Sequence, residues 1–240
     1  MMANTKDLVI RALHEARIFV DDDQATLLAR HLDLVIERNR NINLTRITSP
    51  EEAAYLHVVD SLLLLGAFVD APDGMFVDMG TGAGFPGIPL AIVTGRPALL
   101  VDSVGKKVAC VAEFVGELGL SDHVSVTAAR MEQVGKERRG AFALATARAV
   151  AQTNVLVEYA APLLRRGGRL VVAKARPSDE EVAAGERAAR VCGMRSVSRE
   201  AFELPRDLGH REVLVYERTS KPKVALPRAV GMAKHHPLGV

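Results

Sequence analysis

The sequence is poor in aromatic residues and in cysteine. Tryptophan is absent, aromatic side chains make up only 4% of the 240 residues, and there are two cysteines. So few rings argue against an extended platform on which nucleic-acid bases could stack. Cys110 and Cys192 are far apart and match no metal-ligand spacing. We therefore expect two reduced core thiols, no metal, and a protein of the reducing cytoplasm.

A strong net charge and long apolar segments are also missing. The net charge of +2 is too small to imply nucleic-acid binding by itself, so any basic surface must be local. No apolar run reaches the length of a membrane span, and the polar start Met1–Asp7 is unlike a signal peptide. We therefore expect no membrane partner. The 48% of hydrophobic and 25% of charged residues are typical of a globular chain.

The first 70 residues predict an N-terminal helical extension. One of its helices begins near Asp21, which has a glutamine three residues later as its capping partner. Another begins at Ser49, a capping residue that is followed by a proline and then by Glu52. This helix carries His57 and Asp60, which lie about one turn apart and can form a structural pair.

Residues 71–218 alternate between short β-rich segments and amphipathic helices, one of which begins at Ser178 with Glu181 as its capping partner. The segments are Met75–Asp78, Ala98–Asp102, His123–Thr127, Phe142–Thr146, Arg169–Lys174, Ser196–Phe202 and Glu212–Glu217. Strands separated by helices imply parallel pairing, whereas the last two segments have no long helix between them and should form an antiparallel pair at one edge. We expect an α/β fold with a doubly wound, seven-stranded, Rossmann-like sheet. A basic, irregular tail at residues 219–240 follows.

The first predicted strand runs directly into a glycine-rich loop. Asp78 is followed by Gly80, Gly82 and Gly84, and Pro86 is well placed to open the next helix. Glycines allow a tight strand-to-helix turn and a close approach of a ligand to the backbone. The sequence therefore predicts a ligand site at the carboxyl edge of the sheet.

Two cofactors compete for this loop, and a turn that binds nothing is the plainer alternative. Residues 82–87 also satisfy the dinucleotide pattern G-x-G-x-x-G. A dinucleotide presents a pyrophosphate to the helix start, whereas S-adenosylmethionine presents a cationic amino group and a sulfonium. Asp78 suits that cation. Asp102, which ends the second strand, can accept hydrogen bonds from the ribose of either cofactor. The acid before the loop favours S-adenosylmethionine.

The adenine of such a cofactor is expected after the third strand. Met131 offers an apolar contact there, and Glu132 offers an acceptor for an exocyclic amine. The alternative is an ordinary helix start with a surface acid.

The chain resembles the small-subunit ribosomal RNA methyltransferase G family, once called glucose-inhibited division protein B, over nearly its whole length. The matching segments are Asn43-Leu-Thr45, His57-Val-Val-Asp60-Ser61, Asp78 through Leu90, Asp102-Ser103 with Lys106-Lys107, Arg130-Met-Glu132, Arg148-Ala149, Leu226-Pro-Arg228, Gly231, Lys234 and Pro237-Leu238. The run Gly-Phe-Pro-Gly-Ile-Pro-Leu is far more specific than a generic methyltransferase loop.

This resemblance implies a class I methyltransferase that methylates N7 of a specific guanine in 16S ribosomal RNA with S-adenosylmethionine. It implies that the cofactor contacts Gly80, Phe85, Met131, Glu132 and Arg148. Two positions depart from the family, which usually has an acid at Ala143 and a glycine at Ala175. Because neither is a cofactor position, the departures concern substrate affinity more than chemistry.

Guanine N7 needs no general base, because it carries a lone pair and no proton. The segment after the fourth strand, Thr146–Val150, accordingly lacks the polar-proline-proline-aromatic motif of enzymes that methylate amines. Catalysis would consist mainly of alignment and exclusion of water, with Arg148 as a candidate positioning residue.

Local basic residues are the candidate contacts to RNA. Lys174 ends the fifth strand on the same side of the sheet as Arg148, and the acid-free tail contributes Arg228 and Lys234. His57 is a further candidate for substrate contact. For each of them a salt-bridged or solvated side chain is the alternative. Three more arginines could bind phosphate, namely Arg38, Arg40 and Arg46.

Other functions compatible with this sequence are a small-molecule methyltransferase, a nicotinamide-dependent dehydrogenase and a non-catalytic ribosome-assembly factor. The expected partner is 16S rRNA within the small ribosomal subunit. The sequence does not distinguish free RNA, an assembly intermediate and the complete subunit as substrates. We expect a monomer, because no heptad pattern or long apolar edge is present.

Overall fold

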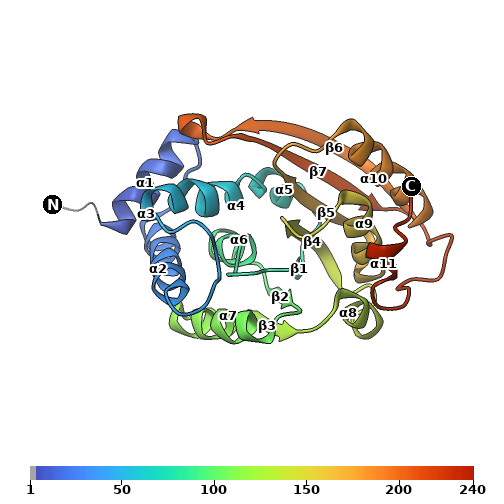
Figure 1. Ribbon diagram of the computed structural model, residues 1–240, viewed down its shortest axis with the longest axis horizontal. Coiled ribbons are helices and arrows are strands. Elements are labelled where there is room, and N and C mark those ends of the chain that lie inside the picture. The colour runs from blue at the N-terminus through green and yellow to red at the C-terminus, as the bar shows by residue number, and fades with distance from the viewer. Residues whose placement is uncertain (1–3) are drawn as a thin grey trace.

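The computed structural model describes residues 4–240, so the first three residues of the polar start lie outside it. A seven-stranded sheet crosses the centre of the molecule (Figure 1). Its strands, in chain order, are β1 (Phe76–Met79), β2 (Ala98–Asp102), β3 (Val124–Ala128), β4 (Phe142–Arg148), β5 (Leu164–Lys174), β6 (Met194–Glu203) and β7 (His210–Arg218). All seven predicted strands are therefore present.

The strands lie in the order β3-β2-β1-β4-β5-β7-β6. The first five pair in parallel, and β7 is antiparallel to both β5 and β6. This confirms the predicted doubly wound sheet with an antiparallel pair at one edge. Because the chain turns outward in opposite directions from β1, the carboxyl ends of β1, β2 and β4 open onto one crevice.

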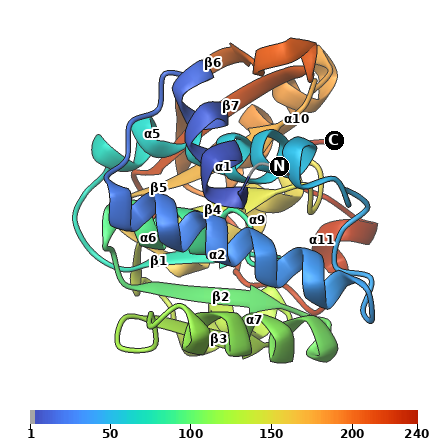
Figure 2. The same cartoon turned by 90° about the vertical axis from the view of Figure 1, so that its left-hand side faces the viewer.

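Helices cover both faces of the sheet and enclose a separate core on each (Figure 2). One core lies beneath α1 (Thr5–Glu15), α2 (Asp22–Asn39), α6 (Gly87–Thr94) and α7 (Gly105–Glu117). The other lies beneath α8 (Met131–Glu137), α9 (Thr153–Leu163) and α10 (Asp179–Val191). The N-terminal extension is thus continuous with the first core, because α2 packs on α6 and α7.

The helix predicted from Ser49 is divided into short pieces. These are α3 (Pro50–Ala53), a π-helical turn η1 (Ala54–Val59), α4 (Asp60–Leu62) and α5 (Leu65–Val69). This stretch, Pro50–Val69, is long and apolar enough by composition to cross a membrane, which corrects the expectation that no segment is. Its most apolar window is 61% buried inside the fold, as is typical of a core helix.

The helix starts predicted near Asp21, Ser49 and Ser178 are all present, but of their capping pairs only the first forms a complete capping box. Asp21 and Gln24 form both reciprocal hydrogen bonds. Ser178 accepts from the backbone N–H of Glu181, yet the Glu181 carboxylate bonds Lys174 and Thr153 instead. The position predicted to open α6 is likewise shifted, since Pro86 caps that helix and Gly87 begins it.

Both cysteines are free and buried, as predicted. Cys110 packs in the first core and Cys192 in the second. Burial raises the pKa of the Cys192 thiol to about 12, so the thiol stays protonated and acts as a small apolar group.

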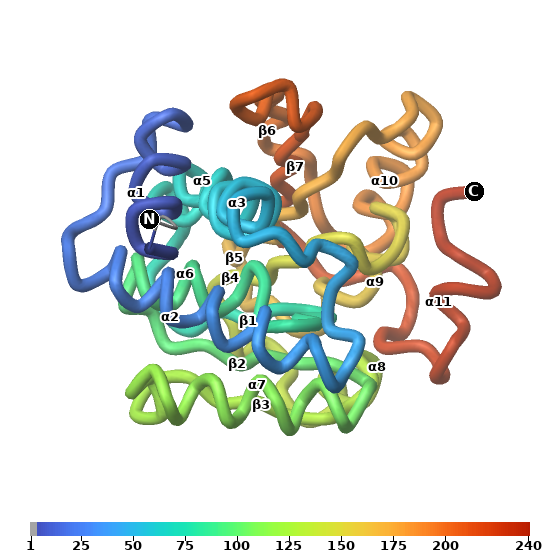
Figure 3. Tube along the Cα trace, turned by 60° about the vertical axis from the view of Figure 1, so that its left-hand side comes forward, coloured from blue at the N-terminus to red at the C-terminus, as the bar shows by residue number. Residues whose placement is uncertain are grey.

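The C-terminal tail, predicted to be irregular, includes one short helix and packs against the domain. It contains a short helix, α11 (Met232–His235), and contributes Leu226 and Ala233 to the second core. Figure 3 shows this segment beside α9. The short η2 turn (Pro205–Asp207) links β6 to β7 on the other side of the molecule.

Candidate functional site

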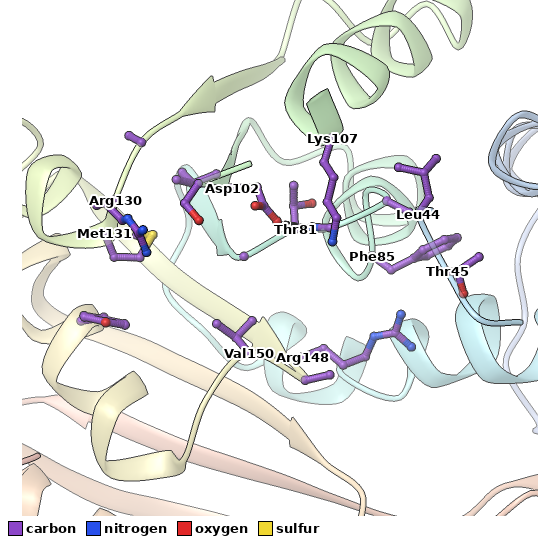
Figure 4. Close-up of a pocket in the computed structure, with 18 of the residues that line it drawn as sticks. Leu44, Thr45, Thr81, Phe85, Asp102, Lys107, Arg130, Met131, Arg148 and Val150 are labelled. Atoms are coloured by element: carbon purple, nitrogen blue, oxygen red, sulfur yellow. Dashed lines mark hydrogen bonds between the residues drawn. The ribbon is translucent and has the colours of Figure 1, made fainter. Parts of the chain in front are cut away.

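A cavity of about 360 Å³ opens at the carboxyl ends of β1, β2 and β4. The glycine loop, the end of β2 and the start of α8 form one part of its wall, and the residues after β4 form another. Outside the sheet, the cavity is completed by Leu44, Thr45, His57 and Lys234. Figure 4 shows two ends: Arg130, Met131 and Asp102 lie toward one, and Phe85, Arg148 and Thr45 toward the other.

Glycine is required at the three loop positions for different physical reasons. All three have positive φ angles, which residues with a side chain rarely adopt. A Cβ on Gly80 would lie 2.6 Å from Val150 Cγ2, and one on Gly84 would lie 2.7 Å from Ile88 Cδ1. A Cβ on Gly82 would meet nothing within 4 Å and would project into open space. Gly80 and Gly82 line the cavity, whereas Gly84 packs behind it.

The Asp102 carboxylate anchors the loop and still has acceptor capacity. Its Oδ2 accepts from the Gly82 N–H at 3.0 Å, and its Oδ1 accepts from the Val104 N–H at 2.9 Å. A carboxylate has about four lone-pair sites, so two bonds leave it able to accept more. Asp102 lines the cavity, as a ligand to ribose hydroxyls must.

Asp78 lies behind the loop and does not line the cavity. It is fully buried, and its Oδ2 accepts from the Gly87 N–H at 3.0 Å, where α6 begins. Three buried oxygens near this point lack a hydrogen-bond partner within residues 4–240: Asp78 Oδ1, Thr81 Oγ1 and Thr146 Oγ1. Burial, opposed by hydrogen bonding, raises the pKa of Asp78 to about 7. The position supports the loop rather than facing a ligand directly.

Replacing Asp78 by asparagine should flatten the pH dependence of stability. The unfolded carboxyl ionises near its ordinary pKa of 3.8, whereas the folded one keeps its proton until about pH 7. The contribution of the protonated Asp78 carboxyl to the free energy of unfolding is therefore complete below pH 4 and is lost as the pH rises to 7. Between pH 4 and pH 7 the free energy of unfolding of the wild type should fall by on the order of a few kcal/mol relative to that of Asp78→Asn.

Urea unfolding between pH 4 and 8 measures this difference. The asparagine side chain keeps an oxygen for the Gly87 N–H, so the start of α6 retains its acceptor. The exposed Asp122→Asn variant removes one carboxyl elsewhere and should follow the wild type. Parallel stability curves for Asp78→Asn and wild type would show that Asp78 is already ionised in the fold.

The opposite wall of the cavity combines apolar side chains with a buried acid. Met131 and Tyr159 line it, and both are buried. Glu132 also lines it, but its Oε1 accepts from the Gly231 N–H at 2.9 Å. The acid predicted to receive an adenine amine therefore also ties the C-terminal tail to this wall.

The other end of the cavity is built from stacked rings. The Phe85 ring stacks on His57 with centroids 4.6 Å apart, and the centroid of the tilted His31 ring lies 4.5 Å from that of Phe85. His57 is in the π-helical turn η1, and such turns frequently occur at functional sites. Burial, together with the nearby Arg148 cation, lowers the pKa of His57 to about 3, so its ring is neutral.

Arg148 is held in place by three partners. It donates at 2.7 Å to the Leu56 carbonyl and to Asp60 Oδ2, and its Nη2 lies 3.3 Å from His57 Nδ1. The other oxygen of Asp60 accepts from Arg211 at 2.7 Å. The expected pairing of His57 with Asp60 is thus indirect, since both meet through Arg148. The next residue, Ala149, has a φ of +56°, a strained value for a residue with a side chain.

The candidate RNA contacts divide into two groups. His57 and Lys234 line the cavity. Lys174 and Arg228 do not line it, and each is paired with an acid: Lys174 with Glu181 at 2.5 Å, and Arg228 with the buried Glu158. Of the other arginines, Arg38 pairs with Glu113, whereas Arg40 and Arg46 are exposed.

The two departures from the family lie in different surroundings. Ala143 is buried on β4, 1% exposed, where an acid would need a partner. Ala175 is exposed and lines a smaller cavity of about 220 Å³ beside Lys174, Arg148 and Arg211. That cavity shares a wall with the main one through Arg148 and Ala149.

Sequence reasoning gave no role to several residues that line the main cavity. Lys107, Tyr159 and Thr45 are the clearest cases. The segment Asn43–Thr45 was visible as a family motif, but no spacing rule brings it to the glycine loop. Its placement depends on Asn39, whose side-chain oxygen accepts from the N–H groups of Leu44 and Thr45. Within residues 4–240, no cluster of three or more His, Cys, Asp or Glu side chains could hold a metal.

Comparison with known proteins agrees with this geometry. Residues 24–209 match the family described as rRNA small subunit methyltransferase G. Ribosomal RNA small subunit methyltransferase G of Gloeobacter violaceus is 40% identical over 224 residues, covering 91% of this chain and 88% of its own length. The protein of that name from Deinococcus radiodurans is 41% identical over 216 residues, with coverage of 88% and 84%.

Solved structures support the fold. The geranyl diphosphate C-methyltransferase of Streptomyces coelicolor, in complex with S-adenosyl-L-homocysteine, superposes with a TM-score of 0.52 at 15% identity. The match covers 67% of this chain and 79% of that one. At this identity the likeness shows a shared fold and nothing more. The sequence matches, which extend over most of the chain, go further: this protein belongs to the rRNA small subunit methyltransferase G family.

Proposed function

We propose that this protein transfers the methyl group of S-adenosylmethionine to N7 of a guanine in 16S ribosomal RNA. Membership in the family makes it an rRNA methyltransferase. One observation carries the proposal: a single cavity has a carboxylate and apolar side chains at one end, and stacked rings with a fixed guanidinium at the other. A small-molecule methyltransferase and a dehydrogenase are not favoured, because the relatives that match along most of the chain are rRNA methyltransferases.

The cofactor end fits S-adenosylmethionine. Asp102 retains acceptor capacity for the ribose hydroxyls, and Met131 and Tyr159 offer apolar surface for the adenine. Gly82 leaves open space beside the backbone for the amino-acid portion. Asp78 supports this surface from behind by accepting a hydrogen bond from Gly87. Glu132 lines the surface while it accepts a hydrogen bond from Gly231. When bound, S-adenosylmethionine supplies an electrophilic methyl group.

The protein's own contribution to chemistry is positioning. Guanine N7 attacks with an existing lone pair, so no side chain has to remove a proton. His57 could not serve as a base in any case, because Arg148 and Thr45 occupy both of its ring nitrogens. Asp60 offsets part of the positive charge of Arg148 and Arg211, which reduces the repulsion of a guanine that becomes cationic on methylation. Phe85 and His57 provide the apolar wall that excludes water.

The substrate is proposed to be RNA within the small ribosomal subunit, met by a monomeric enzyme in the cytoplasm. Exposed basic side chains support this assignment, namely Lys234 at the cavity and Arg40 and Arg46 on the N-terminal part. Lys174 and Arg228 serve the fold through their acidic partners rather than RNA phosphates.

Mapping N7 methylation in 16S rRNA from cells with and without the protein tests the function. The methyl group should disappear from one guanine in the deletion strain and return with the wild-type protein. Complementation with Asp102→Ala should fail, because the variant loses both the anchor of Gly82 and the ribose acceptor. Asp122→Ala, at an exposed position, should complement fully. Unchanged N7 methylation in the deletion strain would refute the proposal.

A further inference from the structure

The Thr45 hydroxyl sits at the end of the cavity that holds Phe85 and Arg148 (Figure 4). Its Oγ1 accepts from the Ile47 N–H at 3.1 Å and lies 2.9 Å from His57 Nε2. The backbone that carries it is fixed, because Asn39 Oδ1 accepts from the N–H groups of Leu44 and Thr45 at 2.8 and 2.9 Å. The hydroxyl oxygen therefore has a defined position.

Arg148 determines which His57 nitrogen carries the proton. A guanidinium has donors only, so Nδ1, which lies 3.3 Å from Arg148 Nη2, must accept. Because burial and the Arg148 cation lower the pKa of His57 to about 3, the ring is neutral and has a single N–H, which is on Nε2. The Leu56 carbonyl and the Asp60 carboxylate each accept from Arg148 at 2.7 Å and so hold the guanidinium against His57.

These contacts use both acceptor sites of the Thr45 hydroxyl. A hydroxyl has two lone pairs and one proton. The Ile47 N–H occupies one lone pair, and the His57 Nε2–H occupies the other. Among residues 4–240 the hydroxyl proton has no protein acceptor of its own. Thr45 therefore presents to the cavity a hydroxyl that can donate but cannot accept.

We propose that Thr45 donates this proton to O6 of the target guanine and so selects guanine over adenine. The inference rests on the proposed function. The guanine edge presents N7 and O6, both acceptors, whereas adenine presents N7 beside an amino donor. A donor-only hydroxyl bonds O6 and leaves the N7 lone pair free for the methyl group. Facing adenine, it would place one donor against another. Thr45 is thus a specificity-determining residue of the site.

The test compares two bases and two variants. Small subunits are assembled with guanine or with 2-aminopurine, which lacks O6, at the target position, and kcat/KM is measured for each. The analogue should lower kcat/KM of the wild type and of Thr45→Ser by about three- to tenfold more than that of Thr45→Val. Thr45→Val should be impaired by about that factor on guanine. The intrinsic reactivity of the base cancels in this comparison.

Two controls keep the outcome interpretable. Thr45→Val also removes the acceptor of the Ile47 and His57 N–H groups, so its S-adenosylmethionine affinity and melting temperature are measured beside those of Thr45→Ser. Equal losses on 2-aminopurine for wild type and Thr45→Val would overturn the inference while leaving the proposed function intact. A wild-type enzyme that methylates no guanine at N7 would overturn the proposed function instead.

A measurement on the wild-type protein tests the His57 tautomer, on which the inference depends. Nitrogen-15 NMR of the imidazole should show the His57 proton on Nε2 in the folded protein. A proton on Nδ1 would free a lone pair of Thr45 and remove the basis of the inference. This arm decides the matter even if Thr45→Val does not fold.

Discussion

Alanine at position 87 is expected to destabilise the protein by about 3 kcal/mol or more. A Cβ there would lie 2.3 Å from Leu100 Cδ2 and 2.6 Å from Asp78 Oδ2. Neither neighbour can move easily, because both are fully buried on adjacent strands of the sheet. The clash would also push the Gly87 N–H away from the carboxylate that receives it.

Gly116 is the matched control, since it is also a helical glycine but a Cβ added there would have nothing within 4 Å. Alanine there should leave stability unchanged or raise it by up to about 1 kcal/mol, because alanine favours a helix. Urea unfolding of Gly87→Ala, Gly116→Ala and wild type gives the comparison. Equal midpoints for Gly87→Ala and wild type would mean that β2 can yield at Leu100.

The fold was predictable because its signals are local. The first five strands are short β-rich runs separated by helices, which implies parallel order, and the lack of a long helix between the last two implies an antiparallel edge. The glycine loop was predictable for the same reason, since a strand, three glycines and a helix follow one another within a few residues. Asp102 reaches the cavity because parallel strands end at one edge of the sheet.

What the sequence did not predict depends on pairing between distant residues. Glu181 has the spacing of a capping box with Ser178, yet Lys174 offers it a full positive charge and competes successfully for the carboxylate. Asp78 has the position of a cation ligand but turns to the start of α6. Thr45 was part of a recognisable motif, and its chemistry depends on a histidine that is oriented by an arginine from β4.

The C-terminal tail also depends on pairing between distant residues. A basic, acid-free segment suggested contacts with RNA, but Arg228 forms a two-bond pair with Glu158, at 2.8 Å through Nε and 2.5 Å through Nη2. Glu158 is only 3% exposed, and Arg228 is its hydrogen-bonding partner within residues 4–240. The same guanidinium donates to the His236 carbonyl and so fixes the turn around α11.

Removal of the Arg228 side chain should therefore cost about 3–5 kcal/mol, because it leaves a buried carboxylate unpaired. It should also weaken S-adenosylmethionine binding, since the same segment supplies Lys234 to the cavity and the Gly231 N–H to Glu132. Calorimetric titration and urea unfolding of Arg228→Ala measure the two losses separately. Lys221→Ala removes an exposed tail charge and should change neither.

A double variant distinguishes the buried pair from a general effect of tail charge. Replacing Arg228 by methionine and Glu158 by leucine removes both charges while keeping apolar volume, and it should recover most of the lost stability. If the double variant is as unstable as Arg228→Ala, the cost comes from the hydrogen bond to His236 rather than from the unpaired acid. If Arg228→Ala unfolds at the same urea concentration as the wild type, the tail does not depend on this pair. Arg228 then becomes a candidate contact to RNA again.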